Sequence, residues 1–105
     1  MDDQEFNRLA DVTLARIEAA LESSNADLDF ELKHGGVLEI EFADGSKIIV
    51  NRHGVAREIW VAAKSGGFHF CYQDNSWLDT RDGAELFAKL SDLASRQAGE
   101  VVVLK

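Results

Sequence analysis

The chain is 105 residues long, 46% of them hydrophobic, with 19 Asp and Glu against 11 Lys and Arg and a formal net charge of −8. This length predicts one domain, residues 1–105, with enough apolar side chains to fold around a single core. The acidic excess argues against nucleic acid as a partner, because phosphates need basic surface, and against anionic membranes.

An amphipathic helix is predicted first, from about Asp3 to Ser23. Its apolar residues recur at helical spacing and are Phe6, Leu9, Ala10, Ile17, Ala20 and Leu21. Beside this stripe, Asp11, Glu18 and Glu22 fall within an arc of about 100° together with Asp3. The helix therefore has one side for the core and one acidic side.

Alternation of apolar and polar residues then predicts a series of strands joined by tight turns. In the first strand, Asp27–Leu32, the apolar residues face one way and Asp27, Asp29 and Glu31 face the other. The following strands are expected at Val37–Phe42, Lys47–Asn51, Arg57–Ala63, Phe68–Tyr72 and a short segment through Trp77. The intervening turns carry Gly35-Gly36, Asp44-Gly45, Ser65-Gly66-Gly67 and Asp74-Asn75.

A second helix is predicted near the end of the chain, with Asp82 as N-cap and Glu85 completing a capping box. Its apolar side consists of Leu86, Phe87, Leu90, Leu93 and Ala94, and Gly99 is suited to end it. Helix, hairpin-linked strands and helix in this order predict an α+β fold. We expect a two-layer α/β sandwich, with both helices on one face of an antiparallel sheet of about five to seven strands. The other sheet face is left to water or partners.

The expected compartment is inferred from three features that the sequence does not show: a disulfide, a secretory signal and a membrane span. Cys71 is the only cysteine, so an intrachain disulfide is impossible. The opening Met1–Glu5 has neither the basic start nor the apolar run of a secretory signal, and no apolar run approaches the roughly 18 residues of a membrane span. We therefore expect a cytoplasmic protein.

Negative charge is concentrated in the first third of the chain. Residues 1–31 hold nine acidic residues against two arginines, a balance of −7, whereas residues 32–105 have a balance of −1. Glu18 and Glu22 lie one helical turn apart, so their carboxylates can share a hard cation. Asp27, Asp29 and Glu31 repeat at about 6.6–6.8 Å on one strand face, too far for tight chelation unless the side chains lean together.

All of these ligands are carboxylate oxygens, which suit hard cations such as ferric iron, Ca²⁺, Mg²⁺ or Mn²⁺. Because no His or Cys joins them, we do not expect a preformed transition-metal site. A solvated acidic face without any metal is the alternative interpretation.

Trp60 is the candidate contact residue of the sheet. If Ile59 and Val61 face the helices, Trp60 stands on the open face, where an exposed Trp suits an interaction hot spot. A reversed register, with Trp60 in the core, is the alternative. Trp77 is expected to be a packing residue.

The remaining chemically distinctive residues carry little expectation of function. His69 and Cys71 share a strand face but lack a third ligand, so we expect them to be incidental exposed residues. His34 and His53 are expected in turns, where His53 could add a peripheral metal ligand. No base activates the lone cysteine, so nucleophilic catalysis has no support.

Several segments closely resemble the frataxin family. They are GGVLEIEF at 35–42, DGSKIIVNR at 44–52, EIWVA at 58–62 and SGGFHF at 65–70. The opening EFNRLAD at 5–11 looks like the bacterial, CyaY-like branch, and the spacing matches across essentially the whole chain. Two features differ from the family pattern: the end of the first helix has fewer consecutive acids, and His53 stands where a Gln followed by Pro is usual.

The resemblance implies a frataxin-like sandwich that binds iron (Fe²⁺ or Fe³⁺) weakly at its surface, with other hard cations also possible. It implies interaction with the cysteine desulfurase of iron–sulfur cluster assembly, whose activity the family modulates, and with the scaffold protein. The candidate metal ligands are Asp11, Glu18, Glu22, Asp27, Asp29 and Glu31. The candidate partner contacts are Glu18, Glu22, Asn51 and Trp60, the last two toward the scaffold.

We therefore interpret the chain as a non-enzymatic, iron-binding regulator of cluster assembly, acting as an iron sensor or iron donor. It is expected to be a monomer, with iron-induced oligomers as an alternative. A ferroxidase or iron-storage protein, oxidising Fe²⁺ at clustered surface carboxylates, is the rival; the sequence lacks the Glu-x-x-His helix pairs of enclosed di-iron sites. An acidic interaction module with no metal role is the third interpretation.

Overall fold

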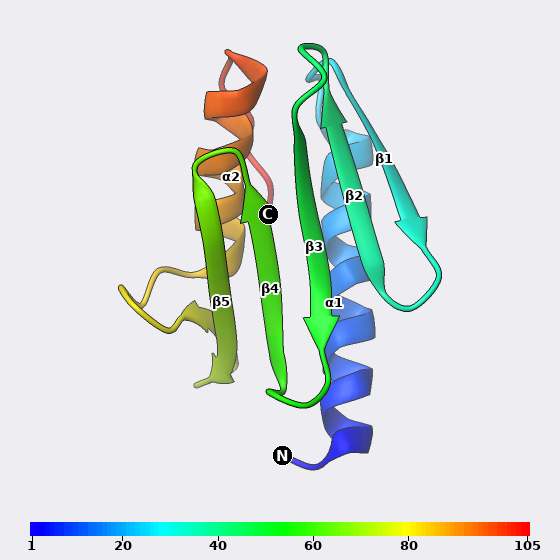
Figure 1. Ribbon diagram of the computed structural model, residues 1–105, viewed down its shortest axis with the longest axis vertical. Coiled ribbons are helices and arrows are strands. Elements are labelled where there is room, and N and C mark those ends of the chain that lie inside the picture. The colour runs from blue at the N-terminus through cyan, green and yellow to red at the C-terminus, as the bar shows by residue number, and fades with distance from the viewer.

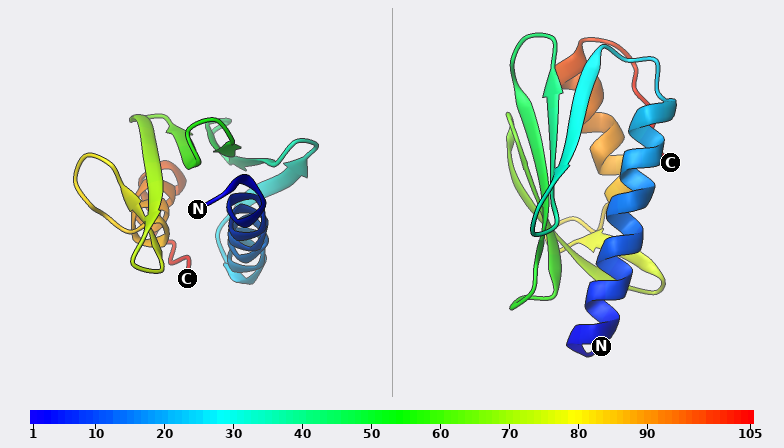
Figure 2. Two further views of the ribbon diagram at one scale, coloured as in Figure 1. Left: turned by 90° about the horizontal axis from the view of Figure 1, so that it is seen from below. Right: turned by 90° about the vertical axis from the view of Figure 1, so that its right-hand side faces the viewer.

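The computed structural model describes all residues, 1–105, and consists of two helices on one face of a six-stranded antiparallel sheet. Its elements are α1 (Asp3–Ser23), β1 (Leu28–Lys33), β2 (Val37–Phe42), β3 (Lys47–His53), β4 (Glu58–Ala63), β5 (Gly66–Gln73), β6 (Ser76–Asp79) and α2 (Leu86–Ala98). Each strand pairs with the next one along the chain. Helix α1 lies behind β1 to β3 and α2 behind β4 and β5 (Figures 1 and 2). The expected α+β sandwich is confirmed.

One core lies between the helices and the sheet. It contains 21 buried apolar residues, drawn from α1, β2, β3, β4, β5, β6, α2 and the C-terminal segment. On β4 the alternation is plain, since Ile59 and Val61 are buried and Ala62 is exposed. The sheet therefore has one apolar face under the helices and one face left open, as strand alternation requires.

Local chemistry sets the ends of α1. The Asp2 carboxylate accepts a hydrogen bond from the Glu5 backbone N–H at 2.8 Å, which satisfies one of the donors left free at a helix start. Asp3 and Glu5 in the first turn face the positive end of the helix dipole. The backbone becomes extended at Ser24, so the helix covers the predicted range.

The start of α2 differs from the prediction. Glu85, not Asp82, is the N-cap, and its carboxylate accepts hydrogen bonds from the backbone N–H groups of Phe87 (2.9 Å) and Ala88 (3.1 Å). Asp82 accepts instead from the Ala84 N–H at 2.9 Å. Gly83 between them has a φ of +74°, a left-handed conformation that interrupts a helix. The predicted capping box was therefore wrong.

Two strands are longer than predicted, because their ends still pair with a neighbour. Strand β3 continues to His53, which lies opposite Glu58, and β5 runs to Gln73, which lies opposite Ser76. Gly66 and Gly67, predicted in a turn, open β5 and pair with Ala63 and Ala62. Neither helix combines the length and apolar character that crossing a membrane requires.

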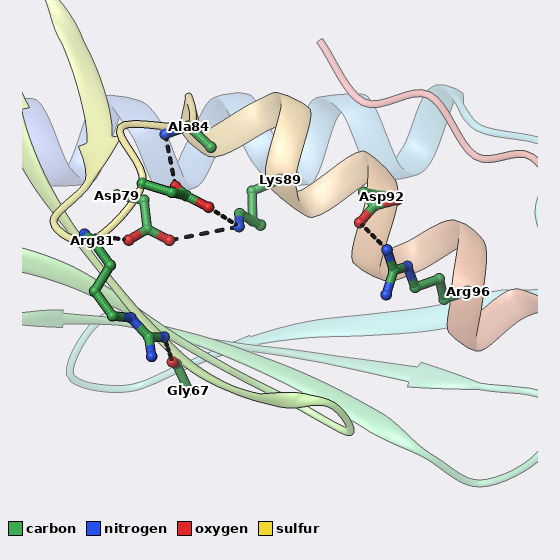
Figure 3. A network of polar contacts seen from close by, with 8 residues as sticks. Gly67, Asp79, Arg81, Ala84, Lys89, Asp92 and Arg96 are labelled. Atoms are coloured by element: carbon green, nitrogen blue, oxygen red, sulfur yellow. Dashed lines mark hydrogen bonds and ion pairs between the residues drawn. The ribbon is translucent and has the colours of Figure 1, made fainter.

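The connection from β6 to α2 is held by a network of charged groups (Figure 3). Asp79 has a side chain only 1% exposed, and its carboxylate lies 3.7 Å from Lys89 Nζ and accepts from the Arg81 N–H at 2.8 Å. Lys89 also donates to Asp82 at 2.9 Å. This bond lowers the pKa of Asp82 and, from the other side, raises the pKa of Lys89.

Thr13 supplies the only hydrogen bond to a buried indole. Trp77 Nε1 donates to Thr13 Oγ1 at 2.8 Å, with Phe6 and Tyr72 packed edge-on against the Trp77 ring. We predict that Thr13→Val, which keeps the shape, lowers the free energy of unfolding by about 1–3 kcal/mol because the buried N–H loses its partner. Urea denaturation measures this, and exposed Val12→Ala is the control, expected within about 0.5 kcal/mol of wild type.

Lys89→Met tests the network of Figure 3. It leaves buried Asp79 without its cation, and we predict a loss of about 1–3 kcal/mol at pH 7. Because the pKa of Asp82 is lowered, the stability from its bond to Lys89 is present above pH 3.8 and disappears as pH falls through the lowered pKa. Denaturation curves should therefore show a smaller wild-type–variant difference at pH 2 than at pH 7. An equal difference at both values, or an equal loss in Lys64→Met, contradicts the prediction.

Candidate functional site

The open face of the sheet is ordered by the strand register. Asn51, Trp60 and His69 form one row across β3, β4 and β5, since Asn51 pairs with Trp60 and Trp60 with His69. On β1 and β2, Asp29 pairs with Glu41, and Glu31 pairs with Glu39. The open face is thus acidic over β1 and β2 and aromatic over β3 to β5.

The acidic part contains two pairs of carboxylates, and the two members of each pair lie directly opposite each other on neighbouring strands. Asp29, Glu31, Glu39 and Glu41 line one shallow hollow of about 320 Å³. Like charges directly opposite on neighbouring strands destabilise a sheet, so this arrangement needs compensating cations. Glu39 and Glu41 were not singled out from the sequence, nor were they joined to Asp29 and Glu31. The Gly35-Gly36 turn between the two strands was the signal for this register.

Lysines neutralise one of these carboxylates. Glu39 accepts from Lys33 Nζ and lies equally close to Lys47 Nζ, each at 2.9 Å. The contacts from Lys47 and then Lys33 hold the pKa of Glu39 below its usual value, and Glu39 in return raises the pKa of Lys47. Neither Asp29 nor Glu31 has a cationic side chain within 4.0 Å, so no ion pair neutralises their negative charges.

Among the acidic residues of α1, Asp11 is already engaged. Its carboxylate lies 2.7 Å from Arg52 Nη1, which also donates to the Asn7 backbone carbonyl at 3.4 Å. Gly36 leaves room for this arginine, because a Cβ there would come within 2.6 Å of Arg52 Nε. Asp11 is thus a candidate metal ligand whose oxygen would first have to leave a cation.

Glu18 and Glu22 lie on the flank of α1 that faces away from α2. Arg16, on the other flank, packs over the Phe87 ring of α2 at 4.2 Å. Because successive residues turn by about 100°, Glu18 and Glu22 lie on the flank of α1 opposite Arg16. Strand β1 lies on the side of α1 that faces away from α2 (Figure 2), so this is the flank nearer β1. Neither glutamate forms an ion pair.

Five of the predicted residues therefore surround the β1 edge of the sheet with unpaired charge. We call them the acidic edge: Glu18 and Glu22 on the helix side, Asp27 in the connection, and Asp29 and Glu31 on the open face. All but half-buried Glu18 are exposed. No group of three or more His, Cys, Asp or Glu side chains is close enough to enclose a metal ion. The arrangement suits loosely held hard cations or a basic surface.

Trp60 lies on the open face, half-buried, as strand alternation predicts. Its indole stacks on His53, with ring centroids 3.8 Å apart and planes 10° from parallel, and on His69 at 4.4 Å and 8°. Its Nε1 donates to Glu58 Oε1 at 2.9 Å. His69, expected to be incidental, and His53, expected in a turn, are thus both part of one aromatic stack. The prediction for His53 was wrong because β3 extends further than its alternation indicates.

Of the remaining two positions, Trp77 has the packing role that was expected, whereas the partner contact expected of Asn51 stays a prediction. Trp77 is a buried packing residue, 4% exposed. Asn51 is half-buried in the Trp60 row, and its side-chain amide donates to the Arg52 carbonyl at 3.3 Å.

Comparison with known proteins agrees with this architecture. Residues 1–100 match the model of the frataxin-like domain. The iron–sulfur cluster assembly protein CyaY of Dechloromonas aromatica is 70% identical over 105 residues, covering all of both chains. The structure of frataxin from Psychromonas ingrahamii is 35% identical, with a TM-score of 0.91 over 100% of this chain and 99% of that one.

A more distant structure shares the fold. Trimeric frataxin from the yeast Saccharomyces cerevisiae, complexed with ferrous iron, is 22% identical, with a TM-score of 0.69 over 95% of this chain and 88% of that one. Three findings agree: two helices on a single antiparallel sheet, the matched frataxin-like domain, and 70% identity to a relative over the full length. The chain belongs to the frataxin family.

Proposed function

We propose that this protein is an iron-binding regulator of iron–sulfur cluster assembly in the bacterial cytoplasm, working as one domain over residues 1–105. The relatives named as cluster assembly proteins support the process. The observation that carries the mechanism is the acidic edge, where five carboxylates lack ion pairs, while Asp11 and Glu39 elsewhere are neutralised by arginine and lysine. Unpaired charge at one edge fits a basic protein surface, here that of a cysteine desulfurase.

Iron binding follows from the same groups. Carboxylate oxygens are hard donors and suit Fe²⁺ and Fe³⁺ as well as Mg²⁺, Ca²⁺ or Mn²⁺. Because all of these carboxylates except half-buried Glu18 are exposed and no three converge, binding is weak and the ion exchanges readily. Such a site suits an iron sensor or donor. Asp11 joins only if Arg52 releases it.

One surface then serves two ligands that exclude each other. The desulfurase must displace cations from Glu18 and Glu22 when its basic residues bind there, and bound iron weakens the docking in proportion to its occupancy. The coupling is reciprocal, since the desulfurase must lower iron affinity by the same factor.

The scaffold protein is the second proposed partner, bound through Asn51 and Trp60. These two residues are neighbours in one row of the open face, which no helix covers (Figure 2). A partly exposed Trp at the centre of a flat surface is typical of interaction hot spots.

We propose no enzymatic activity for this chain. A ferroxidase needs ligands that hold two irons close together, and the dispersed carboxylates offer no such enclosure. The chain is proposed to be a monomer without iron. The yeast relative is trimeric in its ferrous complex, so iron-induced oligomers are an outcome that sedimentation can detect.

An anaerobic Fe²⁺ titration followed by amide NMR tests the proposal. We predict shifts and broadening confined to residues 11–31 and the facing part of β2, because the ligands lie there. Adding a cysteine desulfurase should reverse them by competition. Oxygen consumption by the iron-loaded protein would favour the ferroxidase, and spectra insensitive to iron would favour an acidic module without a metal role.

Charge removal from α1 gives a second prediction. Glu18→Gln with Glu22→Gln should weaken desulfurase binding about five- to thirtyfold, because two charge contacts are lost at roughly 0.5–1 kcal/mol each. The same change should raise the stability of the free protein by about 0.2–0.5 kcal/mol at low salt, because it removes repulsion between like charges four residues apart.

Asp74→Asn with Glu100→Gln is the matched control. It removes the same two negative charges from exposed positions outside the acidic edge. If calorimetry shows equal weakening for both double variants, binding depends on net charge, and the proposed docking surface is wrong.

A further inference from the structure

The stack around Trp60 joins three strands through their side chains. His53 comes from the end of β3, Trp60 from β4 and His69 from β5. The two imidazoles lie on opposite faces of one indole, at 3.8 Å and 4.4 Å, and both are within about 10° of parallel to it. Because both ring faces are covered by histidine, the protonation state of those histidines bears directly on how Trp60 is held.

The hydrogen bonding of His53 depends on its being neutral. Its Nδ1 accepts the backbone N–H of Ala56 at 3.3 Å, so this imidazole carries its proton on Nε2. A protonated imidazole has N–H groups at both nitrogens and accepts no hydrogen bond. Protonation of His53 therefore breaks the bond to Ala56 and turns the ring away from that N–H.

His69 is coupled to Trp60 through Glu58. Its Nδ1 lies 3.7 Å from Glu58 Oε1, the same oxygen that accepts the Trp60 indole N–H at 2.9 Å. A protonated His69 competes for that oxygen as a charged donor, which forms stronger hydrogen bonds than a neutral one. Protonation on this side therefore loosens the indole's own hydrogen bond.

Few other charges reach the stack. Glu58 lies opposite both His53 and Cys71 in the register, and Cys71 is half-buried. Arg57, in the turn after His53, extends to Asp3 on α1 at 2.9 Å. Arg52 lies toward α1, where Asp11 binds it, so the groups facing the two imidazoles are Glu58 and Cys71.

We propose that His53 and His69 are positioning residues for Trp60 and that their protonation switches the open face between two forms. With both neutral, the three stacked rings form an uncharged platform. With both protonated, the bond from Ala56 to His53 is lost, the bond from Trp60 to Glu58 is weakened, and the platform carries positive charge. The assembly of the stack is a property of the free protein; its effect on the scaffold rests on the function proposed above.

The sign of that effect follows from desolvation. A partner that covers Trp60 also covers the two imidazoles, and burial disfavours a charged group. The neutral platform is therefore the form that binds, and acidification from pH 7.5 to 5.5 should weaken scaffold binding about three- to tenfold, equivalent to the loss of roughly one hydrogen bond.

The two indole N–H signals of the protein provide the direct test. The Trp60 signal and the Ala56 amide should move together when the pH falls from 7.5 to 5.5, because both report on the same stack. The Trp77 signal, from an N–H bonded to buried Thr13, should stay in place as an internal control. A Trp60 signal that does not move in this range overturns the switch, whatever the scaffold does.

Phenylalanine variants distinguish an effect of histidine protonation from a purely structural effect of the stacked rings. His53→Phe and His69→Phe keep an aromatic ring on each face of Trp60 without a titrating group. Each single variant should reduce the change of the Trp60 indole signal with pH. In the double variant, the weakening of scaffold binding by about three- to tenfold between pH 7.5 and 5.5 should disappear. His34→Phe, in the exposed β1–β2 turn, should leave both unchanged.

Two outcomes distinguish the switch from the proposed partner. If Trp60 titrates but no scaffold binds at any pH, the switch is supported and the proposed partner contact is wrong. If scaffold binding keeps its full pH dependence in the double variant, His53 and His69 do not control that surface, and the proposal fails.

Discussion

The constraint on which this structure depends is that both helices cover the same face of the sheet. Every strand residue must then enter the core or stand on an open face with no covering layer. Ile59 and Val61 enter the core, so Trp60 between them stands outside. The same rule places Asp29 and Glu31 outside and leaves an open face with two chemically distinct halves.

Strand register and the position of a few cations decide which charges on that surface stay free. Glu39 lies between Lys33 and Lys47, and Asp11 is bound to Arg52. The five carboxylates of the acidic edge, and Glu41 opposite Asp29, are left without such a cation. The excess of −8 in the composition is therefore expressed most strongly along the β1 edge and the adjoining flank of α1, where a basic protein and a hard cation would compete.

Features that depend on local periodicity could be predicted from the sequence. The extent of α1, the inward side of β4 and the outward Trp60 all follow from apolar residues recurring at a period of 3.6 or 2. Features that join distant parts of the chain could not. The contact of Arg52 with Asp11 joins β3 to α1, and the alternation within either element does not reveal it. The stacking of His53 on Trp60 depends on the register of β3 and β4 and on the extension of β3 beyond its alternating segment. The start of α2 was mistaken because Gly83 takes a left-handed conformation in an otherwise plausible capping box.

The central claim is that the acidic edge is the docking surface for the desulfurase. Hydrogen–deuterium exchange of the protein alone and in complex with a cysteine desulfurase tests this, because β1 is an edge strand and has a neighbouring strand on one side only. We predict new protection in residues 18–33, with α2 unchanged. Protection confined to α2 and the C-terminal segment, with β1 exchanging as in the free protein, would contradict it.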